Sequence, residues 1–197
     1  MIDQRHIDNY NEIITECKAI AEKHTRQTFL SICTLLSTIA ADIYPNLNDT
    51  ESFTQLINNY LIHTNSKYQE LTSVLNRYQS NHINCHHTIT FGYVLYKGLR
   101  CKIVHNDYIS QYFYIAHKFE NPNGHLSIQH NKIVLVAEDL LYDIEQMLQL
   151  IINDPSLYTN GITTICNRIE RINLTEEICV DPIYASGLPM NLEDEEN

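Results

Sequence analysis

The chain has 197 residues, 44% of them hydrophobic, which is enough for one domain with a buried core. Its formal charge of −11 disfavours non-specific binding to nucleic acid or to an anionic membrane. With only 5 Gly and 5 Pro, a loop-rich all-β fold is not expected.

Amphipathic helices are predicted along the first part of the chain. Apolar residues recur at helical spacing over about 3–23 and 25–43, and each run is long enough for a helix. The polar turn that follows offers Asp49 or Thr50 as the cap of a third helix. This third pattern continues or restarts to about residue 79.

A change of period follows the fourth predicted helix, which covers about 87–104. Aromatic, β-branched and alternating residues then predict strands in three short runs, at 112–118, 125–129 and 132–137. We expect these runs to form a small antiparallel hairpin or three-stranded meander, in an insert over about 111–137.

Two more helices are predicted after the insert, over about 137–153 and 156–172. The fold class is therefore mainly α: a helical bundle with a small antiparallel β insert after its fourth helix. We expect a single domain over 1–173 and a mobile acidic tail over 174–197.

The cysteines and the N-terminal residues favour a cytoplasmic protein with no membrane span. Six cysteines are scattered without a CxxC pair, which suits free thiols in a reducing compartment. The first ten residues are polar and acidic, unlike a secretory signal. The longest apolar stretch, 29–41, is too short to cross a bilayer.

Histidines are grouped in two parts of the chain where they could bind a metal or a substrate. One polar run holds potential zinc ligands at His82, Cys85, His86 and His87. Adjacent histidines on a helix would point apart and no second ligand pair follows, so a polar loop is expected here and no metal. The β insert carries three more, some of which the strand alternation places on the solvent face: His117, His125 and His130.

The chain has one basic region. Between residues 96 and 132 there are five cations and two acids, whereas the rest of the chain holds eight of the 13 cations and 22 of the 24 acids. Within this region, Arg100 and His105 lie near the end of the fourth predicted helix. A guanidinium suits phosphate oxygens, and an imidazole can take or give a proton near neutral pH. Together they could cleave RNA without a metal, and a second copy of the chain would double the set.

The spacing of this pair constrains its geometry. Five positions along an α-helix correspond to a rotation of about 140°. Arg100 and His105 would therefore meet on one face only if the helix ends or bends between them. In a purely structural alternative, Arg100 pairs with an acidic residue and His105 interacts with the C-terminal end of the helix.

Residues 95–106, LYKGLRCKIVHN, resemble the signature of the HEPN superfamily. In that signature an Arg and a His, separated by four to six residues, lie near the end of an inner helix of a four- or five-helix bundle. Arg100 and His105 match it with four residues between them. The order of helices, motif, short β meander and return helix at 133–148 also resembles a group of bacterial HEPN-like proteins of this size.

This resemblance implies a metal-independent endoribonuclease of a defence or toxin-type system, working as a homodimer without a cofactor. Arg100 would stabilise charge on the phosphate and His105 would be the general acid or base, with both Arg/His pairs at the dimer interface. Lys97, Lys102 and Asn106 would contact the RNA substrate. An antitoxin or regulatory protein is a possible further partner, and neither DNA nor a membrane is expected.

The alternative function is a non-catalytic HEPN-like module for dimerisation or for binding a partner protein or nucleotide. The charge of −11 favours it, and so does Cys101, because the residue after the Arg of the signature is commonly Asn. The third possibility is a purely structural helical protein, in which Arg100 is held in an intrachain salt bridge.

Overall fold

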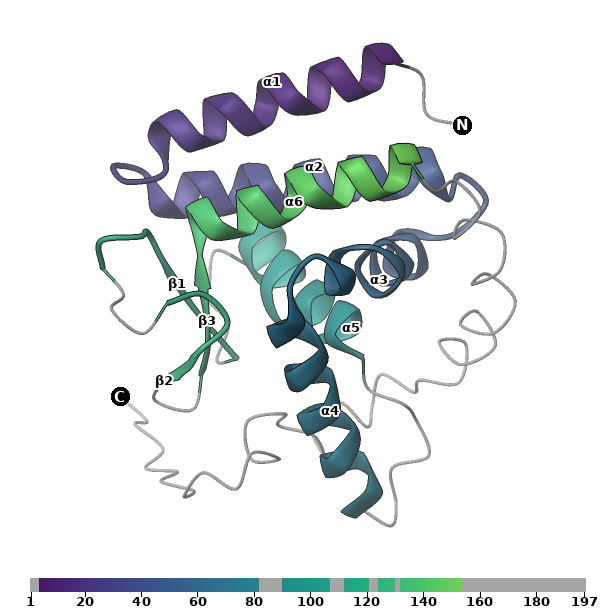
Figure 1. Cartoon of the computed structure of the whole chain (residues 1–197), viewed down its shortest axis with the longest axis vertical. Helices are drawn as coiled ribbons and strands as arrows, with labels where there is room; N and C mark the ends of the chain where they lie inside the picture. Colours follow the sequence, from purple (N-terminus) through teal and green to yellow (C-terminus); the bar gives the residue numbers. More distant parts are fainter. Residues whose placement is uncertain (1–3, 82–89, 107–111, 121–123, 130–131, 154–197) are drawn as a thin grey trace.

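The computed structural model describes the residues of five segments, 4–81, 90–106, 112–120, 124–129 and 132–153 (Figure 1). Its main helices are α1 (Gln4–Ile20), α2 (Thr25–Ile43), α3 (Asp49–Asn59), α4 (Ser66–Asn81), α5 (Phe91–Leu95) and α6 (Ala137–Asn153). The mainly α fold with a small β insert is therefore confirmed. None of the helices in these segments is long and apolar enough to span a membrane.

The helices form layers around α2. Figure 1 shows α1 lying across the α2–α6 pair, and all three helices contact one another. α2 buries side chains on several sides, including Phe29, Ile32 and Leu35, as expected of a helix in the centre of a bundle. α3 packs on α2, and α5 packs on α3. This arrangement brings the residues that follow α5 alongside α2.

The third predicted helix restarts rather than continues. α3 ends at Asn59, the short 3₁₀ helix η1 (Leu61–His63) follows, and α4 then begins. The cap of α3 is Asn48, whose side-chain oxygen accepts a hydrogen bond from the backbone N–H of Glu51 at 3.0 Å. The prediction of Asp49 or Thr50 as the cap is wrong by one or two residues, because both already lie in the first turn of the helix.

The fourth predicted helix begins at Phe91, with the side chain of Thr90 as its cap. Gly92 allows its close approach to α3, since a Cβ at this position would lie 2.7 Å from the carbonyl oxygen of Thr54. The N–H of Gly92 also donates to Asn58 Oδ1 at 3.0 Å. After Leu95 the helix continues to Asn106 in two wider turns, which form the site described below.

The sheet differs from the predicted antiparallel meander. Its strands are β1 (Phe113–Ala116), β2 (Ile128–Gln129) and β3 (Lys132–Val136), in the order β1-β3-β2. β2 and β3 are antiparallel as predicted, whereas β1 and β3 are parallel. Ile133–Val136 is apolar and buried throughout, so β3 takes the central place, and the 11 residues after β1 carry the chain to the far edge.

Several predictions concern residues outside the described segments. They include the helix at 156–172, the acidic tail at 174–197, and the run with its potential zinc ligands at His82, Cys85, His86 and His87. The single domain over 1–173 also stays a prediction.

Candidate functional site

Two π-helical segments carry the Arg/His pair. They are η2 (Tyr96–Arg100) and η3 (Lys102–Asn106), and Cys101 lies between them. Hydrogen bonds in a π-helix join residues five apart, so side chains five apart lie on the same face. As a result Arg100 Nη1 lies 3.0 Å from His105 Nε2. In an α-helix the two side chains could meet only if the helix ended or bent between them. Here the helix continues from Arg100 to His105 and widens into π-helical turns.

The guanidinium of Arg100 is held by two other helices. Its Nη2 lies 2.8 Å from Asp49 Oδ2 at the start of α3, and its Nε donates to Ser37 Oγ of α2 at 3.2 Å. The guanidinium carbon also lies 5.2 Å from the centre of the Tyr96 ring, within the range of a cation–π interaction. The side chain is 14% exposed, against 46% for Asp49. The guanidinium of Arg100 is thus held in one orientation, while the carboxylate of Asp49 is exposed to solvent.

His105 is exposed and faces a group that can only donate hydrogen bonds. In the contact with Arg100, Nε2 must therefore accept, which places the ring proton on Nδ1 of a neutral imidazole. A neutral imidazole next to a fixed cation is the arrangement that a general base beside a phosphate requires.

Tyr96 supports the ion pair from the buried side. Its hydroxyl donates to Asp49 Oδ2 at 2.8 Å, and its ring packs on that of Phe53. Burial raises the pKa of Tyr96 to about 12, and the hydrogen bond to Asp49 adds to this. Tyr96 therefore remains a neutral donor at physiological pH and helps to orient the carboxylate toward Arg100.

The other predicted site residues lie on the same two segments. Lys97 is half-buried, with its Nζ 5.8 Å from the centre of the Tyr96 ring. Lys102 is exposed on η3, which also carries His105 and Asn106. Cys101 is half-buried as a free thiol. These positions add positive charge and hydrogen-bonding groups around the pair.

A second polar cluster, which the sequence does not indicate as a unit, lies in the core. Tyr68 donates from its hydroxyl to Asp143 Oδ2 at 2.9 Å, and His125 Nε2 lies 3.3 Å from the same oxygen. The N–H of Val136 donates to His125 Nδ1 at 3.0 Å, so the ring proton is on Nε2. We call these three side chains the buried network. Burial and Asp143 raise the pKa of Tyr68 well above its ordinary value.

The structure places two of the three histidines of the β insert, and one of them belongs to the buried network. His125 is only 5% exposed and is not on the solvent face. His117 is half-buried with Nε2 3.2 Å from Glu120 Oε1, and His130 lies outside the described segments. One feature of the sequence could have indicated the buried network: Asp143 lies on the apolar stripe of α6, and a carboxylate there requires a buried hydrogen-bond partner.

Comparison with protein-family models, with curated proteins and with solved structures finds no match to this chain. The chemistry of the site therefore carries the argument for function.

Proposed function

We propose that this protein is a metal-independent endoribonuclease of a defence or toxin-type system, with Arg100 and His105 acting on the RNA phosphate at a dimer interface. The observation that carries the proposal is the 3.0 Å contact between Arg100 Nη1 and His105 Nε2. It brings a fixed cation and a neutral imidazole together at a solvent-facing position, inside the most basic stretch of an acidic chain.

The reaction needs a base, a cation and an acid. When the substrate phosphate takes over the Nη1 donor of Arg100, the freed Nε2 lone pair of His105 takes the proton of a ribose 2′-hydroxyl, and the 2′-oxygen forms a bond to phosphorus. Arg100 stabilises the negative charge of the pentacoordinate phosphorane. The bond from phosphorus to the 5′-oxygen then breaks, and an acid protonates the leaving oxygen. The products are a 2′,3′-cyclic phosphate and a 5′-hydroxyl.

A second copy of the chain would supply that acid. A single copy places one Arg and one His at the site, and the same imidazole cannot lie on both sides of the phosphorus at once. Val104, next to His105, is a large hydrophobic side chain that is 38% exposed, which favours burial against another protein surface. Lys97, Lys102 and Asn106 would hold the RNA on either side of the scissile phosphate. The cytoplasmic location and an antitoxin or regulatory partner remain part of this proposal.

The test is cleavage of labelled single-stranded RNA by the purified full chain in EDTA. We expect cleavage that leaves a 2′,3′-cyclic phosphate, and a fall in rate of about 10²–10⁴-fold in Arg100→Ala or His105→Ala. His63→Ala, an exposed histidine on η1, is the matched control and should cleave normally. Absence of cleavage across a panel of RNAs, or normal cleavage by both site variants, would overturn the proposal.

One observation favours a non-catalytic protein, either the purely structural helical protein, in which Arg100 is held in an intrachain salt bridge, or a HEPN-like binding module. Asp49 and Ser37 already occupy two edges of the guanidinium, so a phosphate must displace or share these partners. Asp49→Asn separates the two functions because it removes the competing charge but keeps an acceptor for Tyr96. A ribonuclease should then show a lower KM for RNA. A binding module should cleave no RNA before or after the change, and should instead retain a partner protein or nucleotide.

A further inference from the structure

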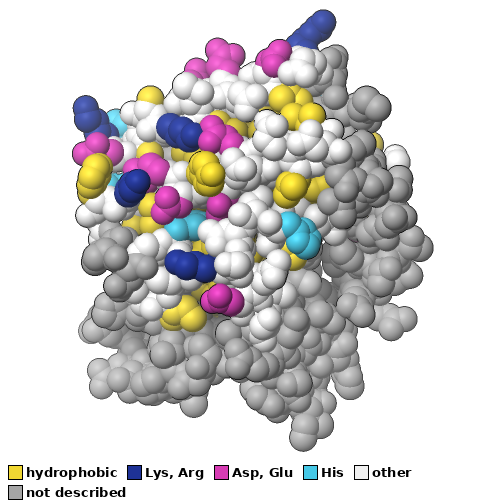
Figure 2. Space-filling view, in the orientation of Figure 1, with side chains coloured by type: hydrophobic (Ala, Val, Ile, Leu, Met, Phe, Trp, Pro, Cys, Tyr) yellow, Lys and Arg dark blue, Asp and Glu magenta, His cyan; other side chains and the backbone are white. Residues whose placement is uncertain are grey.

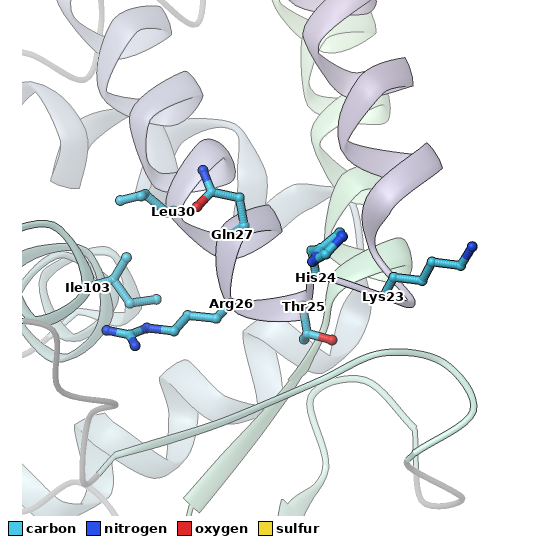
Figure 3. A pocket seen from close by; sticks show the side chains of 7 residues that line it. All are labelled: Lys23, His24, Thr25, Arg26, Gln27, Leu30 and Ile103. Atoms are coloured by element: carbon cyan, nitrogen blue, oxygen red, sulfur yellow. The ribbon is translucent and has the colours of Figure 1, made fainter.

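A pocket of about 500 Å³ opens beside the Arg/His site, between the start of α2 and η3. Its lining residues are Lys23, His24, Thr25, Arg26, Gln27, Leu30 and Ile103 (Figure 3). Figure 3 shows the side chain of Arg26 extending toward Ile103, which lies two residues before His105. The pocket therefore shares the η3 segment with the proposed catalytic site.

The lining of this pocket is positive in an acidic chain. Lys23 and Arg26 carry full charges, His24 adds a third nitrogen base, and no Asp or Glu lines the pocket among the residues that the structure describes. The face seen in Figure 2, over α1 and α6, is different because cations and acids are interspersed on it. Lys18 of α1, for example, is paired with Glu145 of α6 at 2.7 Å. The sequence places Lys23 and Arg26 far from the basic stretch at 96–132, and the fold brings them to its η3 segment.

The pocket and the catalytic pair lie along one stripe of α2. Arg26, Leu30 and Ser37 are four and seven positions apart, which places them on the same side of the helix. Arg100 contacts Ser37, and Ile103 meets Leu30 in the pocket, so η2 and η3 run along this stripe toward the start of α2. The 11 positions from Arg26 to Ser37 correspond to about 16 Å along the helix. A strand of a few nucleotides spans such a distance.

We infer that this pocket binds a backbone phosphate of the same single-stranded RNA, a few nucleotides away from the phosphate at Arg100 and His105. The inference rests on the proposed ribonuclease function and adds a second contact point to it. Arg26, whose side chain extends toward Ile103, neutralises the phosphate, and Lys23, which Figure 3 shows extending to the opposite side, adds to the positive potential of the lining; phosphate contacts supply most of the affinity of such complexes. The amide of Gln27 and the imidazole of His24 are placed for hydrogen bonds to ribose or base, and Leu30 and Ile103 give an apolar surface against which a base can lie.

The test measures binding separately from cleavage. A fluorescent ten-nucleotide single-stranded RNA is titrated with full-length His105→Ala protein, in which the proposed base is absent, and with the same protein carrying Lys23→Gln and Arg26→Gln. We expect the two pocket substitutions to raise Kd about tenfold. The slope of log K against log salt should shrink by about 0.7, because one neutralised phosphate is lost from a single strand.

The matched control removes the same two charges from α1, with Arg5→Gln and Lys18→Gln in the His105→Ala background. It should bind RNA within about twofold of its parent, since the net charge change is the same and only the position differs. Circular dichroism and thermal unfolding check that both double variants are folded.

The outcomes separate the two proposals. If the pocket variant binds RNA as tightly as its parent and with the same salt dependence, or if the α1 control weakens equally, the pocket inference fails. The same holds if the parent binds no RNA. If the pocket variant binds weakly as expected but the wild-type chain never cleaves RNA, the inference stands and the ribonuclease proposal fails.

Discussion

Two regions of this molecule use the same side-chain types in opposite surroundings. In the site, Tyr96 donates to Asp49 at 2.8 Å, and Arg100 links that carboxylate to His105. In the buried network, Tyr68 donates to Asp143 at 2.9 Å, with His125 against the same oxygen. In both regions a tyrosine hydroxyl orients a carboxylate, which meets a histidine directly in the buried network and through Arg100 in the site.

Burial separates the two regions. In the buried network the histidine and the carboxylate are each about 5% exposed, so water cannot replace a lost partner. In the site His105 is exposed and Asp49 is 46% exposed, so a substrate can take the place of either partner at low cost. The same polar groups therefore stabilise a core in one place and remain accessible to solvent in the other.

The largest effect is expected from Asp143→Ala. It leaves the Tyr68 hydroxyl and the His125 ring N–H without their acceptor in the core, and each unsatisfied buried donor costs about 1–3 kcal/mol. Urea unfolding at neutral pH measures the loss. Glu145→Ala, two positions further along α6, is the control: it breaks the surface pair with Lys18, worth at most about 1 kcal/mol. Equal losses in the two variants would remove the distinction between the regions.

A smaller effect is expected at alkaline pH from Tyr96. Its pKa is about 12 in the folded chain, against an ordinary value of 10.0, so the folded state holds the proton more tightly. The stabilisation is complete below about pH 10 and is lost as the pH rises to about 12. Urea unfolding across this range should show a steeper decline for the wild type than for Tyr96→Phe. Tyr68, whose pKa is also raised, is present in both proteins, so the difference isolates Tyr96. Parallel curves would contradict the assignment.

The smallest effect is expected from His105→Ala, which should change the free energy of unfolding by no more than about 0.5 kcal/mol because the side chain is exposed. His125→Ala should cost about 2–5 kcal/mol, since it both empties a core position and orphans the Val136 N–H. Thermal unfolding of the two variants side by side is the measurement. A large loss for His105→Ala would identify His105 as part of the scaffold.

Sequence periodicity predicts the long helices well. α2 and α6 match their predicted ranges because each buries a continuous apolar stripe, and that stripe is visible without knowledge of its partners. The parallel pairing of β1 with β3 could not be predicted this way. It depends on which neighbour the buried Ile133–Val136 strand finds, and a short apolar run does not specify that.

The site was predicted by residue type but not by geometry. Arg100 and His105 follow from their chemistry and from their resemblance to a known signature. Their contact depends on π-helical turns, and the turns lie where Arg100 is held by Ser37 and Asp49, residues more than 50 positions away. Such long-range partners have no counterpart in a local pattern. The buried network was missed for the same reason, because Tyr68 and Asp143 are 75 positions apart.

The two π turns have a consequence for how this chain can tolerate changes in length. Side chains five apart on a π-helix are neighbours, just as side chains four apart are on an α-helix. A chain one residue shorter between Arg100 and His105 could keep the two in contact by returning to α winding. A change from π to α winding could therefore absorb a single deletion between the two side chains. In distant relatives, the distance between the two side chains would then be better preserved than the number of residues that separates them.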